Sequence, residues 1–153
     1  MSEKGNKMSV LYGSQTGNAE MLAYDVEALA SDDFEVQVAG LDEISLEDIM
    51  ASDYLIICCS TWGDGEQPDN AQDMFDEATD SDDGAFSGTQ FAILALGDTA
   101  FDLFCESGKE WDELLEGKGG SRINERIDCD VDYEDEAEEW IEETVDLMKA
   151  HLE

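Results

Sequence analysis

Short apolar runs alternate along the chain with segments in which apolar residues recur at three- and four-residue intervals. The runs Met8–Tyr12, Phe34–Val38, Tyr54–Cys59, Gln90–Leu96 and Arg122–Ile127 predict five β-strands. The third run is apolar throughout, which favours a strand buried on both faces of a sheet.

Four segments between or after these runs have apolar residues at helical spacing. Pro68 and Asp69 predict the start of the second helix, and Gly119-Gly120 the end of the third. The apolar positions are Met21, Leu22, Val26 and Leu29; Ala71, Met74, Phe75 and Ala78; Phe104, Trp111, Leu114 and Leu115; and Ala137, Trp140, Ile141, Thr144 and Met148.

Regular alternation of strand and helix, without an internal repeat or a linker, predicts an α/β fold. The expected architecture is a three-layer α/β/α sandwich around a parallel five-stranded sheet. We expect residues 1–7 to form a flexible start and residues 8–153 to form a single domain. Ligands of such sheets bind beyond the carboxyl ends of the strands, which directs attention to the loops 13–18, 60–67 and 97–102.

The charge of the chain limits its partners. The 153 residues include 7 Lys and Arg against 41 Asp and Glu, a net charge of −34, while 42% of the residues are hydrophobic. Such a surface repels nucleic acid and anionic membranes and attracts basic protein surfaces. Two origins of the acidity stay open: adaptation to a saline habitat, and an acidic docking face for a redox partner.

Neither a membrane span nor a secretory leader is expected. The longest apolar run, Tyr54–Cys59, is far shorter than the roughly 20 residues that a transmembrane helix needs. No basic segment precedes an apolar one near the start of the chain. We therefore predict a cytoplasmic protein that is a monomer. We also expect no further domain, because the chain ends soon after its last predicted helix.

The cysteines predict reduced thiols rather than a disulfide or metal site. Cys58 and Cys59 are neighbours in one predicted strand, and Cys105 and Cys129 complete a set with no CxxC pair. The only histidine, His151, lies almost at the end of the chain. We therefore expect no metal.

The first of the three loops, Gly13–Asn18, has the chemistry of an anion site. Backbone N–H groups at a helix start attract phosphate, and Ser14 and Thr16 add neutral donors. The loop has no lysine, so it does not match the nucleotide-hydrolase pattern GxxxxGK[ST]. An ordinary polar turn with a helix cap is the alternative interpretation.

The other two loops each carry an aromatic residue beside glycine. Trp62 in residues 60–65 offers a flat surface for stacking, and Phe101 follows the glycine after the fourth strand. Each could instead pack at the rim of the core or within it. An anion site and two aromatic loops at one edge together indicate a phosphate attached to a planar ring.

The same three loops resemble a known family. YGSQTGNAE (12–20), STWGDG (60–65) and ALGDTAFDLFCESGKEWD (95–112) look like the FMN-contacting segments of flavodoxins, in order and at the family's spacing. Residues 95 to about 133 are similar to the flavodoxin domain of the sulfite reductase flavoprotein, whereas Trp62 resembles the free, short-chain flavodoxins. The resemblance implies the flavodoxin-like strand order 2-1-3-4-5.

The resemblance also implies which residues contact FMN. Trp62 and Phe101 would cover the two faces of the isoalloxazine ring, and the Gly63-Asp64 peptide would meet its N5. Phe101 stands where the family usually has tyrosine, and Ala19 replaces a common hydroxyl residue. The implied FMN-binding set is Ser14, Gln15, Thr16, Gly17, Asn18, Ala19, Ser60, Thr61, Trp62, Gly63, Asp64, Leu96, Gly97, Asp98, Phe101, Phe104 and Cys105.

By this resemblance the function is that of a flavodoxin. We expect a soluble, low-potential one-electron carrier between a basic-surfaced reductase and an acceptor, without a catalytic site of its own. One alternative is an FMN electron-donor subunit that works in complex with a reductase such as sulfite reductase. Another is a receiver-type signalling domain, which would need acidic residues where Tyr12-Gly13-Ser14 stands.

Overall fold

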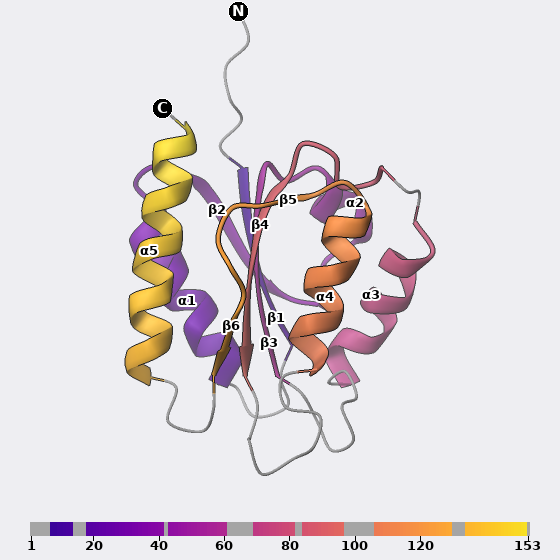
Figure 1. Ribbon diagram of the computed structural model, residues 1–153, viewed down its shortest axis with the longest axis horizontal. Coiled ribbons are helices and arrows are strands. Elements are labelled where there is room, and N and C mark those ends of the chain that lie inside the picture. The colour runs from indigo at the N-terminus through magenta and orange to yellow at the C-terminus, as the bar shows by residue number, and fades with distance from the viewer. Residues whose placement is uncertain are drawn as a thin grey trace, which may run out of the picture.

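A parallel β-sheet runs through the middle of the molecule, with helices on both of its faces (Figure 1). The strands are β1 (Lys7–Gly13), β2 (Glu35–Gly40), β3 (Tyr54–Ser60), β4 (Gln90–Leu96), β5 (Ser121–Arg122) and β6 (Ile127–Cys129). The helices are α1 (Asn18–Ala30), α2 (Leu46–Met50), α3 (Asp69–Thr79), α4 (Glu106–Gly117) and α5 (Glu134–Leu152). The computed structural model describes residues 7–13, 18–41, 43–60, 69–81, 84–96, 106–129 and 134–152.

The strand order confirms the predicted flavodoxin-like fold. The sheet has the order β2-β1-β3-β4-β5, and β6 pairs with β4 beside β5, so that β5 and β6 share the fifth position. β1 begins at Lys7, one residue before the predicted start, because Lys7 pairs with Glu35 and its carbonyl accepts from the Asp53 N–H at 3.0 Å. Within the described ranges, no helix is long and apolar enough to cross a membrane.

Two apolar clusters fill the spaces between the three layers. Figure 1 shows α1 and α5 on one face of the sheet and α2, α3 and α4 on the other. Val10, Ile56 and Leu94 point toward α1 and α5, and their neighbours Leu11, Ile57 and Ile93 point toward the other helices. The central strands are therefore buried on both faces, as their apolar runs predict.

The predicted strand Arg122–Ile127 is wrong in its middle, where residues 123–126 separate β5 from β6. Side chains take over the backbone hydrogen bonds there. Asn124 Oδ1 accepts from the Glu125 N–H at 2.9 Å, and Trp140 Nε1 donates to the Glu125 carbonyl at 2.8 Å. The Asn124 amide also donates to the Thr144 hydroxyl at 2.9 Å, which ties the interruption to α5.

The apolar stripe predicted for the first helix is also partly wrong. Leu22 and Val26 are buried as expected, but Met21 and Leu29 are 65% and 41% exposed. Two alanines at positions 23 and 30 complete the buried side instead. Their small side chains let α1 lie close to the sheet, and this rotates the larger Met21 and Leu29 away from the core.

The short helix α2 was not predicted from the apolar pattern. Ser45 caps it, with its hydroxyl accepting from the Asp48 N–H at 3.2 Å, and Ile49 is the buried residue that holds it to the sheet. A serine followed by acidic residues is the sequence signal of such a helix start. Five residues are too few to show a helical period.

Candidate cofactor-binding site

The register of the sheet brings the ends of the three predicted loops together. Gly13 pairs with Cys59, Ser60 pairs with Leu96, and Leu96 in turn pairs with Cys129. All of these residues lie at the carboxyl edge of the sheet, the lower edge in Figure 1. The segments after β1, β3 and β4 therefore start next to one another, as the flavodoxin resemblance implies.

Four residues of the predicted FMN-binding set lie in elements of the structure. Asn18 and Ala19 are the first two residues of α1, Ser60 ends β3, and Leu96 ends β4. These positions confirm the backbone placement at the carboxyl edge and leave the predicted contacts with FMN as predictions. The rest of the set lies outside the described residues: Ser14, Gln15, Thr16, Gly17, Thr61, Trp62, Gly63, Asp64, Gly97, Asp98, Phe101, Phe104 and Cys105.

The start of α1 has the donors that a phosphate requires. Only residues 14–17 separate the end of β1 from the 13-residue helix α1, so the N-terminus of the helix lies at the carboxyl edge. The first backbone N–H groups of an α-helix have no partner inside the helix, and its dipole favours an anion. This donor set can hold a phosphate monoester without a lysine or arginine.

A close contact between Gly108 and Ala95 packs the start of α4 against the end of β4. A Cβ atom on Gly108 would lie 2.3 Å from the Ala95 Cβ, so α4 can approach β4 this closely only with glycine at that position. Ala95 immediately precedes the last residue of β4, and Gly108 lies in the first turn of α4. The contact thus fixes the end of β4 relative to the start of α4.

Tyr12 and Glu43 connect the end of β1 with the segment after β2. The Tyr12 hydroxyl donates to Glu43 Oε1 at 2.8 Å, and the same oxygen accepts from the Gly40 N–H at 2.9 Å. The pKa of Glu43 is lowered, mainly by the hydrogen bond from the Gly40 N–H and to a lesser degree by the one from the Tyr12 hydroxyl. The pKa of Tyr12 is raised, mainly by burial and then by its hydrogen bond to Glu43. The sequence pattern did not predict this pair. Its hydrogen bonds stabilise the backbone at the end of β1.

Asp112 organises the end of the sheet beyond β4. Its carboxylate, whose side chain is 8% exposed, accepts from Arg122 Nε at 2.8 Å and from Arg126 Nη1 at 3.2 Å. Arg126 Nε also contacts Asp128 Oδ1 at 2.7 Å, and the hydrogen bond that Arg122 donates to Asp112 raises the pKa of Arg122. The cluster fixes the interrupted fifth strand to α4 and so fixes β6, which forms one side of the carboxyl edge.

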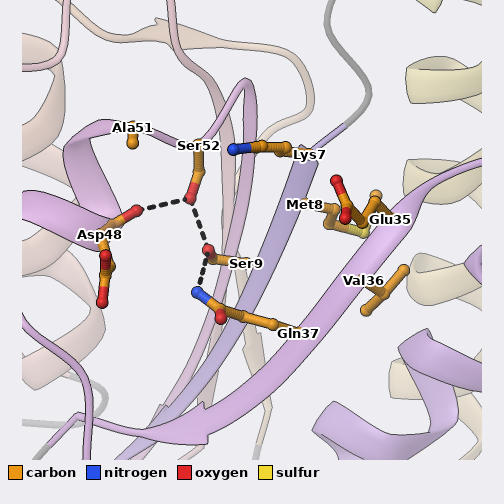
Figure 2. A pocket seen from close by; sticks show the side chains of 9 residues that line it. All are labelled: Lys7, Met8, Ser9, Glu35, Val36, Gln37, Asp48, Ala51 and Ser52. Atoms are coloured by element: carbon orange, nitrogen blue, oxygen red, sulfur yellow. Dashed lines mark hydrogen bonds between the residues drawn. The ribbon is translucent and has the colours of Figure 1, made fainter.

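A polar pocket of about 320 Å³ lies at the other end of the sheet and is distinct from this edge. Figure 2 shows that its hydroxyl and amide groups bond to one another. Gln37 Nε2 donates to the Ser9 hydroxyl at 3.3 Å, Ser9 contacts Ser52, and the Ser52 hydroxyl donates to the Asp48 carbonyl at 3.1 Å. These bonds join β1, β2 and the end of α2, which is a structural role.

The described framework fits a phosphate-bearing planar group at the carboxyl edge. Only residues 14–17 separate Gly13 from the start of α1, whose N–H groups suit a phosphate, and the adjacent ends of β3 and β4 are where the two predicted aromatic loops begin. In FMN these two parts belong to one molecule. The geometry of the framework and the chemistry of the loop sequences therefore agree.

Comparison with known proteins gives the same result. The family model described as flavodoxin matches residues 10–143. The chain is 30% identical to oxidised flavodoxin 2 from Bacillus cereus, with a TM-score of 0.82, covering 95% of this chain and 99% of that one. The flavodoxin from Streptococcus pneumonia TIGR4 gives 26% identity and a TM-score of 0.85, covering 95% and 99%.

Longer proteins also contain a segment similar to this chain. The sulfite reductase [NADPH] flavoprotein alpha-component of Bacillus subtilis (strain 168) is 40% identical over 137 residues, which are 89% of this chain and 23% of that protein. The protein of the same name from Vibrio parahaemolyticus is 34% identical over 152 residues, which are 99% of this chain and 24% of that protein. The chain thus spans about a quarter of the length of these relatives.

The fold, the edge geometry and these matches define an FMN-binding electron-transfer protein. The chain belongs to the flavodoxin family.

Proposed function

We propose that this chain is a low-potential one-electron carrier, which accepts an electron from a reductase and passes it to an acceptor protein. The observation that carries the proposal is the adjacency of the three loop origins at Gly13, Ser60 and Leu96, with the flavodoxin order of sequence motifs. FMN supplies the redox chemistry when bound, and the chain supplies binding and orientation.

Each loop has its own part in holding FMN. Residues Ser14 to Ala19 hold the phosphate through backbone N–H groups and hydroxyls, without a cation. Trp62 and Phe101 would enclose the ring, which would exclude water from its faces and leave an edge for electron exchange. The backbone from Leu96 to Asp98 would meet the polar edge of the ring, and Phe104 and Cys105 would complete the site.

The charge of the chain determines both the potential and the partners. A net charge of −34 disfavours the addition of further electrons to an anionic site, because Coulomb repulsion persists where aromatic side chains exclude water. It also favours reductases and acceptors with basic surfaces. We infer a cytoplasmic monomer that converts no substrate of its own.

A series of variants tests the ring contacts. Trp62→Ala and Phe101→Ala should each weaken FMN binding by about 1–3 kcal/mol, the range measured when an aromatic partner of a stacked base is removed. Phe101→Tyr keeps the aromatic surface and should bind FMN like the wild type. Wild-type affinity in both alanine variants, measured by quenching of FMN fluorescence, would refute the stacking assignment.

The similarity to the Bacillus subtilis flavoprotein favours a second function. At 40% identity to part of a sulfite reductase component, the chain could serve as the FMN donor subunit of a reductase complex. A carrier exchanges electrons in brief encounters, whereas a subunit stays bound. Sedimentation of the FMN-loaded chain with separately purified reductase components distinguishes the two: the carrier sediments alone at micromolar concentration, and the subunit does not.

A further inference from the structure

Exposed apolar side chains gather on one helix of this acidic protein. Among the described residues, four large hydrophobic side chains are exposed, and three of them belong to α1: Met21 at 65%, Tyr24 at 49% and Leu29 at 41%. A single exposed apolar residue needs no explanation, whereas a group of them marks an interaction surface. The buried side of α1 does not use these residues, so their hydrophobicity has no role in the core.

Two of these residues line a groove between α1 and α5. Met21 and Leu29 belong to its lining, together with Ala28 from α1 and Ile141 from α5, and its volume is about 570 Å³. Ile141 is 1% exposed and forms the floor. The groove thus has an apolar floor, and its α1 side carries Met21, Ala28 and Leu29 over about two helical turns, with Asp25 between them.

Carboxylates border the same groove. Asp25 lies on α1, and Glu138 and Glu142 lie one turn apart on α5, all three exposed. The ion pairs between described residues use other acids, namely Asp33, Asp112, Glu116 and Asp128. The three border carboxylates thus carry charge that no cation in the described part of the chain neutralises.

This combination selects one kind of occupant. A second copy of the chain would bring the same acidic border against itself, which like-charge repulsion opposes, and nucleic acids and anionic bilayers are repelled in the same way. An amphipathic helix with apolar residues at i, i+3/i+4 and i+7 fills such a groove. Lysines or arginines beside its apolar stripe, one turn apart, match Glu138 and Glu142.

We propose that the groove between α1 and α5 is a docking site for a basic amphipathic helix of a partner protein. Both helices begin at the carboxyl edge, α1 at Asn18 and α5 at Glu134, so Met21 and Glu138 lie within about one turn of it (Figure 1). A helix bound in the groove would hold the partner protein beside the carboxyl edge of the sheet. The inference that this partner is a redox protein rests on the proposed function, whereas the docking site itself does not depend on it.

The probe for this site is a fluorescein-labelled synthetic helix of about 18 residues, composed of leucine on one face and lysine on the other. Its binding to the FMN-loaded protein is measured by fluorescence anisotropy at 0.15 M salt, where the Debye length is about 8 Å and long-range attraction is screened. The double variants Met21→Ser/Leu29→Ser and Glu138→Gln/Glu142→Gln should each raise the Kd at least about fivefold.

Matched variants outside the groove serve as controls. Asp73→Asn/Glu77→Gln removes two exposed carboxylates, also one turn apart, from α3 on the opposite face of the sheet. Leu147→Ser removes an apolar side chain that is 39% exposed on α5 and does not line the groove. Both controls should change the Kd by less than about twofold.

Two results would overturn the proposal. Equal increases of the peptide Kd in the groove variants and in the control variants would show that the peptide does not bind through the groove. A monomer–dimer equilibrium in sedimentation that Met21→Ser/Leu29→Ser abolishes would assign the groove to a second copy. FMN affinity, titrated in parallel, should be the same in all four variants as in the wild type. If the wild-type protein bound the peptide through the groove but did not bind FMN, the proposed function would be refuted and the docking site would stand.

Discussion

Gly108 on α4 lies so close to Ala95 on β4 that a Cβ atom at position 108 would come within 2.3 Å of the Ala95 Cβ. The contact packs α4 against the strand just before its carboxyl end, where the third loop begins. Glycine at position 108 is thus required by packing and not by backbone conformation. The same contact connects core packing with the strand end from which the third predicted loop begins.

Gly108→Ala should destabilise the protein by about 1–3 kcal/mol, the usual cost of overpacking a tight core contact. Urea unfolding followed by circular dichroism measures the change. Gly117→Ala is the matched control, because a Cβ on Gly117, at the end of the same helix, meets nothing within 4 Å. It should leave stability unchanged or raise it by about 0.4–1 kcal/mol. Equal effects at the two positions would contradict the packing argument.

Asp112→Asn should destabilise the protein by about 1–3 kcal/mol, because it removes the buried carboxylate that two arginines share, while Arg122 keeps Glu116 and Arg126 keeps Asp128. Asp33→Asn breaks the exposed pair with Lys149 and should cost less than about 1 kcal/mol. Chemical denaturation of the two variants gives the comparison. If Asp112→Asn were no more destabilising than Asp33→Asn, the cluster would not fix the fifth strand.

The pKa of Glu43 tests the connection with Tyr12. Because the folded-state pKa of Glu43 is lowered, its hydrogen bonds stabilise the fold above the ordinary pKa of a glutamate, and this contribution is lost as the pH falls through the lowered pKa. Tyr12→Phe should raise the pKa of Glu43 but leave it below its ordinary value, since the larger cause, the Gly40 N–H, remains. NMR titration of the Glu43 carboxyl carbon measures both effects. An unchanged Glu43 pKa in Tyr12→Phe would show that the hydroxyl does not act on the carboxylate.

Salt should stabilise the protein. Repulsion among 41 acidic residues is screened as KCl rises, so the melting temperature should increase up to molar concentrations. Differential scanning calorimetry at 0.1 M and 1 M KCl provides the test. A melting temperature that stays flat or decreases would favour the alternative that the acidity serves docking alone.

The sequence predicted the sheet well because its strands are apolar runs of ordinary length. Tyr54–Ser60 and Gln90–Leu96 are buried on both faces and are found within one residue of their predicted bounds. The interruption of the fifth strand could not be predicted, because Trp140 and Thr144 of α5 bond to Glu125 and Asn124 there, and only tertiary structure brings α5 to these residues.

The orientation of α1 was missed because hydrophobicity alone favoured Met21 and Leu29 over two small alanines. Close packing against the sheet reversed that preference and left the larger residues to line the groove. At the carboxyl edge, the motifs predicted which strand ends lie next to one another. They could not predict Glu43 or Gly108, whose roles depend on neighbours that are distant in the sequence or in another element.

Titration of the purified chain with FMN shows whether the chain binds this cofactor. We expect saturation at about one FMN per chain, with strong quenching of FMN fluorescence and a yellow protein from which acid releases the flavin. Riboflavin, which lacks the phosphate held at the start of α1, should bind much more weakly and serves as the control. A colourless chain that leaves FMN fluorescence unchanged at micromolar concentration would show that this chain is not an FMN carrier.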